Sequence, residues 1–462
     1  MATKPKKLIG MDKSEFDELV KENIISLRPA RLIPLINPGK EEALTSIFLS
    51  SLTLVDEFKR DILKVVGLPQ GGKLFVYTEI TFPDQENSRV DGLILIVVAK
   101  KIKSAALLEM KNGKATLNKD QIEQYLKIAK QFGIPKMITI SNEFVSEPTQ
   151  SPLGINKLPK GINLYHLSWQ FIRTIARIRL FENDTNIEDI DQVRIMEEVI
   201  AYFESEKSGV GILGFSQMKS GWKKISENVS MQTTVRKTDS DLRETIESWL
   251  QEERDMALKL SCELGALVRS DISKFKGNIQ ARINNDLDLF LKTHILTSVL
   301  NIPSAVSNII VRANFKTRAI EMLVNIIPPK DKTIKGQFGW IKRQIENNAI
   351  KKNLINKDSD PSILDNLYVE LWVKYAKNPD RFPYSKLEDE VVHYKGKDIK
   401  KVSIVYIETL GRNFSAPKKF VEIIEKMLPK FYGDIVQYLQ NWVKPAPRIS
   451  KNNDIIETNA DQ

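Results

Sequence analysis

The chain has 462 residues, 42% of them hydrophobic, and a formal net charge of +10. This length predicts two or three domains, and the basic balance favours a polyanionic partner, nucleic acid first. The single cysteine, Cys262, excludes an internal disulfide and a cysteine-based zinc site, and it fits the reducing cytoplasm.

A short segment precedes the first candidate domain. Residues 1–10 are basic but lack an apolar core of signal-peptide length. Residues 13–27 have the spacing of an amphipathic helix. No stretch approaches 18 uninterrupted apolar residues, so no membrane partner is expected. We assign residues 1–39 to a tail and a helix.

The next region alternates between helical and strand patterns. Residues 40–67 predict one long helix that begins with Glu41 and Glu42. Three strands are expected at residues 73–82, 89–99 and 104–110, followed by a helix at 118–132 and a strand at 135–141. A further strand and helix are predicted within residues 162–181. The order is helix, three strands, helix, strand.

Each of the three strands carries a carboxylate that an ordinary buried strand would not keep. Glu79 lies in the first strand, Asp91 near the start of the second and Glu109 at the end of the third. Because strand residues two apart share a face, Glu109 and Lys111 should project side by side. Carboxylates on adjacent strand ends suit Mg²⁺, for which Mn²⁺ can substitute. The pattern predicts metal-assisted phosphodiester hydrolysis.

A helical pair completes the pattern, since Gln121 and Tyr125 are four residues apart and so lie on one helix face. With Asp91, Glu109-Met110-Lys111 and this Gln-xxx-Tyr pair, residues 40–180 resemble the PD-(D/E)xK nuclease superfamily. The likeness is to the branch that contains RecB-type nuclease domains and lambda exonuclease. Val90 replaces the proline that is usual before the motif aspartate, and the histidine that precedes the core in some relatives has no counterpart.

The resemblance implies a fold and a set of roles. The fold is an α/β restriction-endonuclease-like domain over residues 40–181, with an αβββαβ core and a mixed sheet. The implied catalytic residues are Asp91, Glu109, Lys111, Gln121 and Tyr125. The implied metal ligands are Asp91 and Glu109, with Glu79 and a first-helix glutamate, Glu42 or its neighbour Glu41.

Lysines surround the expected site. Lys103, Lys114 and Lys119 can contact nucleic-acid phosphates without reading sequence. The alternative for each of them is an ordinary solvated surface charge.

The remainder has a different character. Residues 182–300 predict a mainly helical region, with a two-helix hairpin or a coiled-coil arm at 239–276, and residues 301–443 an α+β domain. In that domain a strand-strand-helix pattern occurs twice, as in a degenerate duplication. Residues 444–462 are expected to be disordered.

No P-loop and no second carboxylate cluster is evident after residue 182. We therefore expect this half to serve recognition, control or homo-oligomer assembly through residues 239–276. Its strands interleave basic residues with Phe315, Trp372 and Tyr375, which suggests nucleic acid as a partner. An ordinary α+β sheet gives the same pattern.

Two function classes fit these observations. The first is a metal-dependent nuclease that acts on DNA in preference to RNA, in phage defence, restriction or repair, with endonuclease or exonuclease action left open. The alternative is a catalytically inactive, nuclease-like nucleic-acid-binding or regulatory protein. The complete set of Asp91, Glu109, Lys111 and Gln121 favours the active enzyme.

Overall fold

The chain folds into two compact units. The computed structural model describes residues 7–22, 24–29, 40–83, 88–113, 115–145, 147–155, 157–180, 187–210, 215–271, 273–275, 278–346 and 361–443. The first unit combines residues 1–322 with 407–430, and the second combines 323–406 with 431–462. The predicted disordered tail at 444–462 lies outside the described residues.

A six-stranded mixed sheet forms the centre of the N-terminal part of the first unit. Its strands follow in chain order: β1 (Ser26–Pro29), β2 (Lys73–Thr81), β3 (Arg89–Val98), β4 (Lys101–Met110), β5 (Lys136–Ser141) and β6 (Asn163–Ser168). Strands β1 to β4 are antiparallel neighbours, whereas β4, β5 and β6 are parallel. The predicted mixed α/β class with a mixed sheet is confirmed.

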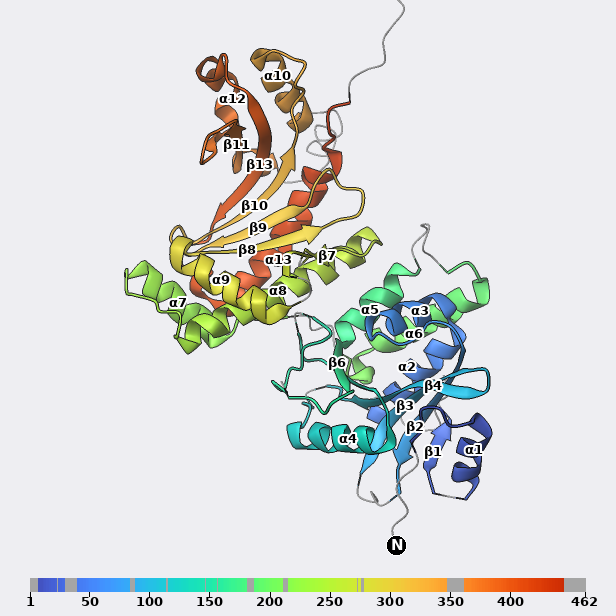
Figure 1. Ribbon diagram of the computed structural model, residues 1–462. Helices are drawn as coiled ribbons and strands as arrows, with labels where there is room; N and C mark the ends of the chain where they lie inside the picture. Colours follow the sequence, from blue (N-terminus) through green and yellow to red (C-terminus); the bar gives the residue numbers. More distant parts are fainter. Residues whose placement is uncertain are drawn as a thin grey trace, which may run out of the picture. The chain divides into compact units, whose positions relative to one another are not determined.

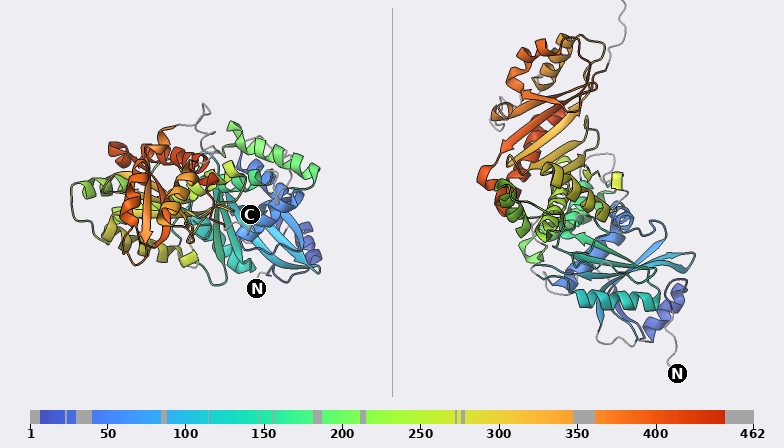
Figure 2. Two further views of the ribbon diagram at one scale, coloured as in Figure 1. Left: turned by 90° about the horizontal axis from the view of Figure 1, so that it is seen from above. Right: turned by 60° about the vertical axis from the view of Figure 1, so that its left-hand side comes forward.

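Helices cover both faces of this sheet (Figures 1 and 2). On one face lie α2 (Glu41–Leu54), α3 (Asp56–Val65), α5 (Trp169–Ile178) and α6 (Ile190–Glu204). On the other face lie α1 (Lys13–Lys21) and α4 (Lys119–Phe132). Each face buries its own apolar cluster against the sheet. Side chains that alternate along β2, β3 and β4 therefore enter two different cores.

Local signals explain several element boundaries. Asn118 caps α4, because its side chain accepts a hydrogen bond from the Gln121 N–H at 3.1 Å, and Gly133 ends the helix with φ 68°. Strands β3 and β4 are joined by Ala99 and Lys100, both in the left-handed region. That pair of positive φ angles matches the right-handed twist of a two-residue hairpin turn.

The predicted helix over residues 40–67 is two helices. Val55 is extended, with φ −128° and ψ 106°, and separates α2 from α3. The Asp56 N–H, which the break releases from the helix, donates to Gln192 Oε1 at 2.9 Å. A residue from α6 thus stabilises the break. The N-terminal helix is also shorter than predicted, because residues 26–29 form β1.

The rest of the first unit is built around one long helix. α8 (Ser240–Leu264) is a single helix that contacts α5, α7 (Ser220–Ser230) and α9 (Ile279–Thr293). The predicted hairpin or coiled-coil arm is wrong, because only Ser240, Arg243 and Glu263 of α8 are exposed. A helix buried on nearly all sides by its own chain is a core element.

A second sheet has seven strands in the order β12-β11-β13-β10-β9-β8-β7. The two predicted strand-strand-helix segments share this one sheet, in which β13 lies between β10 and β11. Its adjoining helices are α10 (Ile334–Ile345), α12 (Leu387–Glu390) and α13 (Pro417–Asp434). The strands are β7 (Arg269–Ser270), β8 (Ile295–Asn301), β9 (Ile309–Asn314), β10 (Ala319–Ile326), β11 (Leu367–Val373), β12 (Asp380–Pro383) and β13 (Ile399–Thr409).

Candidate metal centre and active site

Two carboxylates meet at neighbouring ends of β3 and β4, the two central strands of the six-stranded sheet. The β3–β4 register pairs Gly92 with Leu108, so the next position outward sets Asp91 opposite Glu109. Directly opposed residues of an antiparallel pair point to the same face. That face is the one covered by α4, since Leu93 and Leu107 belong to the α4-side core. Asp91 is partly buried and Glu109 is only 1% exposed.

Lysine and backbone groups hold these two carboxylates. Asp91 Oδ2 accepts a hydrogen bond from the Met110 N–H at 2.7 Å. Lys111 Nζ lies 2.8 Å from Glu109 Oε1 and 2.9 Å from Glu41 Oε2. Lys111 is itself fixed, because its N–H donates to Ile140 O at 2.8 Å and its carbonyl accepts from the Trp169 indole at 2.9 Å.

The electrostatics of the pair reflect crowding of negative charge. Burial and the neighbouring Glu109 carboxylate raise the pKa of Asp91 well above its usual range. Burial also raises the pKa of Glu109, although the Lys111 ammonium opposes this effect. For Lys111, burial lowers the pKa, but the hydrogen bonds and charges of Glu109 and Glu41 outweigh burial and raise it. The single ammonium of Lys111 therefore offsets the negative charge of three carboxylates, those of Asp91, Glu109 and Glu41.

Two other predicted metal ligands are held by an arginine. Arg89 Nη1 lies 2.7 Å from Glu79 Oε2, and its Nη2 lies 3.5 Å from Glu42 Oε1. Glu79 is in the left-handed region, with φ 57°, at an irregularity in the pairing of β1 with β2. Glu41, and not Glu42, is the first-helix glutamate beside Lys111. Arg89 is not among the residues predicted from the sequence, although it stands two residues before Asp91 and so shares its face.

The predicted pair on α4 forms a hydrogen-bonded chain. Gln121 Nε2 donates to the Tyr125 hydroxyl at 2.9 Å, and that hydroxyl donates to Arg89 O at 2.6 Å. Burial and the Glu109 charge raise the pKa of Tyr125 to about 12, which keeps the phenol protonated. The chain links α4 to the strand that carries Asp91. In the part of the chain that the structure describes, Gln121 bonds Tyr125 and not Lys111.

The polar row continues across the parallel strands. The register pairs Glu109 with Thr139 and Thr139 with His166. Thr139 Oγ1 lies 3.0 Å from His166 Nδ1, and His166 Nε2 lies 2.9 Å from Glu143 O. Burial lowers the pKa of His166 to about 4, so its imidazole is neutral at pH 7. Because Nε2 faces a carbonyl, Nε2 carries the proton and Nδ1 accepts from Thr139. His166 is a fully bonded core histidine.

The predicted nucleic-acid lysines differ in position. Lys103 lies on β4 six residues before Glu109, which at strand spacing is about 20 Å away. Lys119 is exposed at the start of α4, two residues before Gln121, and its Nζ is 4.0 Å from Glu123 Oε1. Lys114 lies outside the described residues. Of the three, Lys103 therefore lies away from the site, and Lys119 lies on the helix that carries Gln121 but not on the same face of it.

The aromatic residues proposed for nucleic-acid contact also divide. Phe315 is fully buried and packs on Trp222, Phe290 and Phe414, so it belongs to the core. Tyr375, by contrast, is 94% exposed.

The prediction of no second carboxylate cluster after residue 182 is wrong, because such a cluster joins α8 to α13. Within the described ranges, Glu252, Asp255 and Glu425 form the one group of three potential ligands whose oxygens all lie within 4.8 Å. Lys259 lies 2.8 Å from Asp255 Oδ2 and also pairs with Glu425. Among the described residues, the carboxylates at the ends of β3 and β4 do not form so tight a group. The Lys259 ammonium therefore already offsets part of the negative charge of the α8–α13 cluster.

No family model, curated protein or solved structure matches the chain. Among the described residues, no helix is both long and apolar enough to cross a membrane.

Proposed function

We propose that the first unit is a metal-dependent nuclease of the PD-(D/E)xK type, with a restriction-endonuclease-like αβββαβ core. The order of elements along the chain supports this core: helices α2 and α3 come first, then strands β2, β3 and β4, then α4 and β5. The observation that carries the proposal is the meeting of Asp91 and Glu109 on adjacent strands, with Lys111 Nζ 2.8 Å from Glu109. That grouping places a fixed ammonium beside two acids, an arrangement that suits metal-assisted phosphodiester hydrolysis.

The acid pair fits a divalent cation. Glu109 Oε1 lies 2.8 Å from Lys111 Nζ, whereas the buried Oε2 has no hydrogen-bond partner among the described residues, so Oε2 retains capacity for a ligand. Asp91 and Glu109 would hold Mg²⁺ or Mn²⁺, and Glu41 is the nearest further carboxylate. When bound, such a cation polarises a phosphoryl oxygen and lowers the pKa of bound water.

The chain's own residues supply positioning and charge. Lys111, held by its backbone and by Glu41, can orient the attacking water or offset charge that develops on the phosphate. Gln121 and Tyr125 fix α4 over the acid pair through the Arg89 carbonyl. These contacts favour a preorganised site over a solvated one.

Nucleic acid is the proposed substrate, with DNA favoured over RNA. The net charge of +10 attracts phosphate backbones, and Lys119 stands exposed at the N-terminal end of α4. Binding through phosphates should depend on salt and only weakly on sequence.

The test is cleavage by the purified full chain. Linear, circular and single-stranded DNA, with RNA in parallel, are incubated with Mg²⁺ or with EDTA. We expect Mg²⁺-dependent cleavage that Glu109→Gln abolishes and Glu123→Gln retains, because Glu123 is an exposed glutamate of α4. Binding without cleavage by a folded wild type would contradict the nuclease and favour the inactive binding protein.

A further inference from the structure

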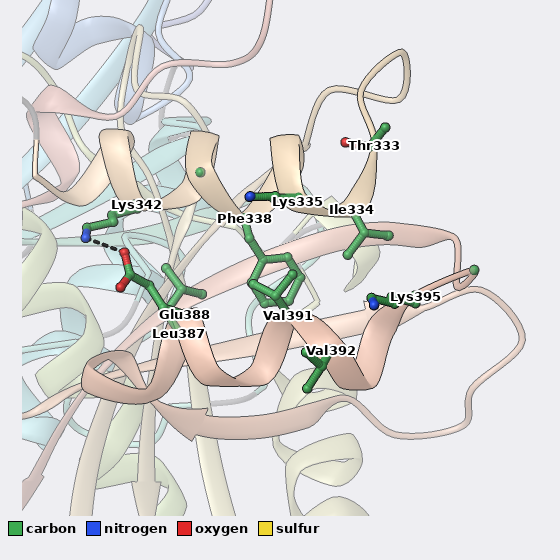
Figure 3. A pocket seen from close by; sticks show the side chains of 12 residues that line it. Thr333, Ile334, Lys335, Phe338, Lys342, Leu387, Glu388, Val391, Val392 and Lys395 are labelled. Carbon is green, nitrogen blue, oxygen red and sulfur yellow. Dashed lines mark hydrogen bonds and ion pairs between the residues drawn. The ribbon is translucent and has the colours of Figure 1, made fainter.

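An apolar groove with a basic rim lies within the second unit. It has a volume of about 660 Å³ and is formed by α10, α12 and the turn at Val391–Tyr394. Figure 3 shows the side chains of Phe338, Leu387 and Val391 converging between α10 and the helical segment opposite. Phe338 and Leu387 are buried, whereas Val392 is 59% exposed at the edge. A concave apolar surface of this size suits two or three apolar side chains of a peptide.

The rim selects for negative charge. Three lysines line the groove (Lys335, Lys342 and Lys395), and only one carboxylate does, Glu388. Glu388 is already paired with Lys342. Lys335 and Lys395 are exposed and have no ion pair within the described ranges. The matching occupant therefore has apolar side chains flanked by carboxylates.

The last described residues of this unit lie beside α10, the helix that forms one wall of the groove. The Gln440 N–H donates to Gln344 Oε1 at 2.8 Å, near the end of α10. Lys332 Nζ lies 4.1 Å from the centroid of the Trp442 ring, just before the start of α10. Residues 440–442 thus follow α10 toward its N-terminal end, where Thr333, Ile334 and Lys335 line the groove.

The residues that come next carry the complementary chemistry. Residues 454–457 read Asp-Ile-Ile-Glu, and Asp461 follows. The eleven residues that follow Val443, 444–454, can span up to about 36 Å. The 12-residue α10 is only about 18 Å long. The acidic segment therefore reaches every part of the groove.

We propose that this groove binds residues 454–461 of its own chain. Ile455 and Ile456 fill the apolar floor at Phe338 and Val391, and the adjacent carboxylates face Lys335 and Lys395. Tethering makes the contact intramolecular, at an effective concentration on the order of 1 mM. Weak individual contacts are then sufficient. The proposal is independent of the nuclease activity.

Cross-linking in the full chain tests the proposal. Cys262, the only native cysteine, is replaced by Cys262→Ser, and Val392→Cys is combined with Ile456→Cys. Mild oxidation should give an intramolecular disulfide, detected by mass spectrometry. The matched control replaces Val392→Cys by Tyr375→Cys, a 94% exposed position of the same unit that does not line the groove. Equal yields in both, no disulfide, or disulfide-linked dimers alone would overturn the proposal, the last by assigning the groove to a second copy.

Hydrogen exchange gives a second readout without cysteines. With a Kd on the order of 100 μM for the free segment, tethering keeps the groove about 90% occupied and slows exchange of residues 387–396 about tenfold. Ile455→Asp with Ile456→Asp should restore fast exchange in these residues and leave β11 unchanged. Unchanged exchange in residues 387–396 would refute self-binding.

Discussion

Replacement of Asp91 by asparagine separates the proposed chemistry from folding. Asparagine keeps the size of the side chain and an oxygen that can accept from the Met110 N–H, now 2.7 Å from Asp91 Oδ2. It removes one of three carboxylates that share the Lys111 ammonium. Asp91→Asn should therefore abolish Mg²⁺-dependent cleavage and still stabilise the cation-free protein.

The size of the gain follows from the register. Opposed residues have Cβ atoms about 5 Å apart, and at an effective dielectric constant of about 20 two like charges there repel by about 3 kcal/mol. Solvent screening at the partly buried Asp91 and partial protonation reduce this value. We expect Asp91→Asn to raise the free energy of unfolding by about 1–2 kcal/mol at pH 7 in EDTA.

The raised pKa of Asp91 also predicts how the stability of the wild type should change with pH. Because the pKa of Asp91 is raised in the folded protein, the fold retains a proton that the unfolded chain releases near pH 4. Wild-type stability should thus fall as the pH rises from about 4 toward the raised pKa, and the difference from Asp91→Asn should grow over the same range. Urea unfolding of both proteins between pH 4 and pH 8 measures this difference.

A lower free energy of unfolding for Asp91→Asn than for the wild type at pH 7 would contradict net repulsion between Asp91 and Glu109. It would mean that attraction to Lys111 and the charged hydrogen bond to Met110 outweigh repulsion from Glu109. Asp91 would then be a structural carboxylate. Glu123→Gln, on the exposed face of α4, is the control for the general effect of removing one negative charge.

Four further predictions concern the neighbours of this pair. Lys111→Met should lower the cleavage rate at least about a hundredfold, since groups that stabilise transition-state charge contribute about 2.7–4 kcal/mol, with binding measured by anisotropy nearly unchanged. Glu41→Gln should reduce turnover more than Glu42→Gln, because only Glu41 contacts Lys111, and steady-state rates of the two variants decide this. Tyr125→Phe should cost about 1–3 kcal/mol in urea unfolding, since the Arg89 carbonyl loses the hydroxyl that bonds it. His166, whose pKa burial lowers to about 4, should make stability fall by about 3 kcal/mol as the pH drops from 6.5 to 4, and His166→Gln should remove that dependence in unfolding curves.

Strong local patterns made the elements around the site predictable. Strands β2, β3 and β4, and helix α4, lie within a few residues of their predicted bounds. Apolar runs of strand length, the Asn118 cap and Gly133 are all signals within one short window of sequence. The expected proximity of Asp91 and Glu109 needed only antiparallel neighbours, which short connections favour.

The parts that the sequence did not reveal depend on distant residues. The break at Val55 is supported by Gln192, 136 residues from the bonded Asp56. The carboxylate cluster of α8 is completed by Glu425, from a helix near the end of the chain. From the sequence, Phe315 could be an exposed aromatic residue of a strand, but in the fold Trp222 and Phe414 pack against it. In each case a tertiary contact overrides a local pattern, and no single window contains both partners.

The choice among acidic residues shows the same limit at the site itself. The sequence identifies acidic residues that could share a metal ion. In the structure, however, ion pairs with the side chains of Arg89 and Lys111 determine which of these carboxylates are available to it. Arg89 pairs with Glu79 and Glu42, and Lys111 pairs with Glu41 and Glu109. A divalent cation at the neighbouring ends of β3 and β4 would therefore compete with Lys111 for Glu109 and with Arg89 for Glu79. Asp91 accepts from the Met110 N–H and forms no ion pair among the described residues, so it could turn toward a cation without breaking one. If the proposed function holds, Arg89 and Lys111 would thus rank the candidate metal ligands, with Asp91 before Glu109 and Glu79 last.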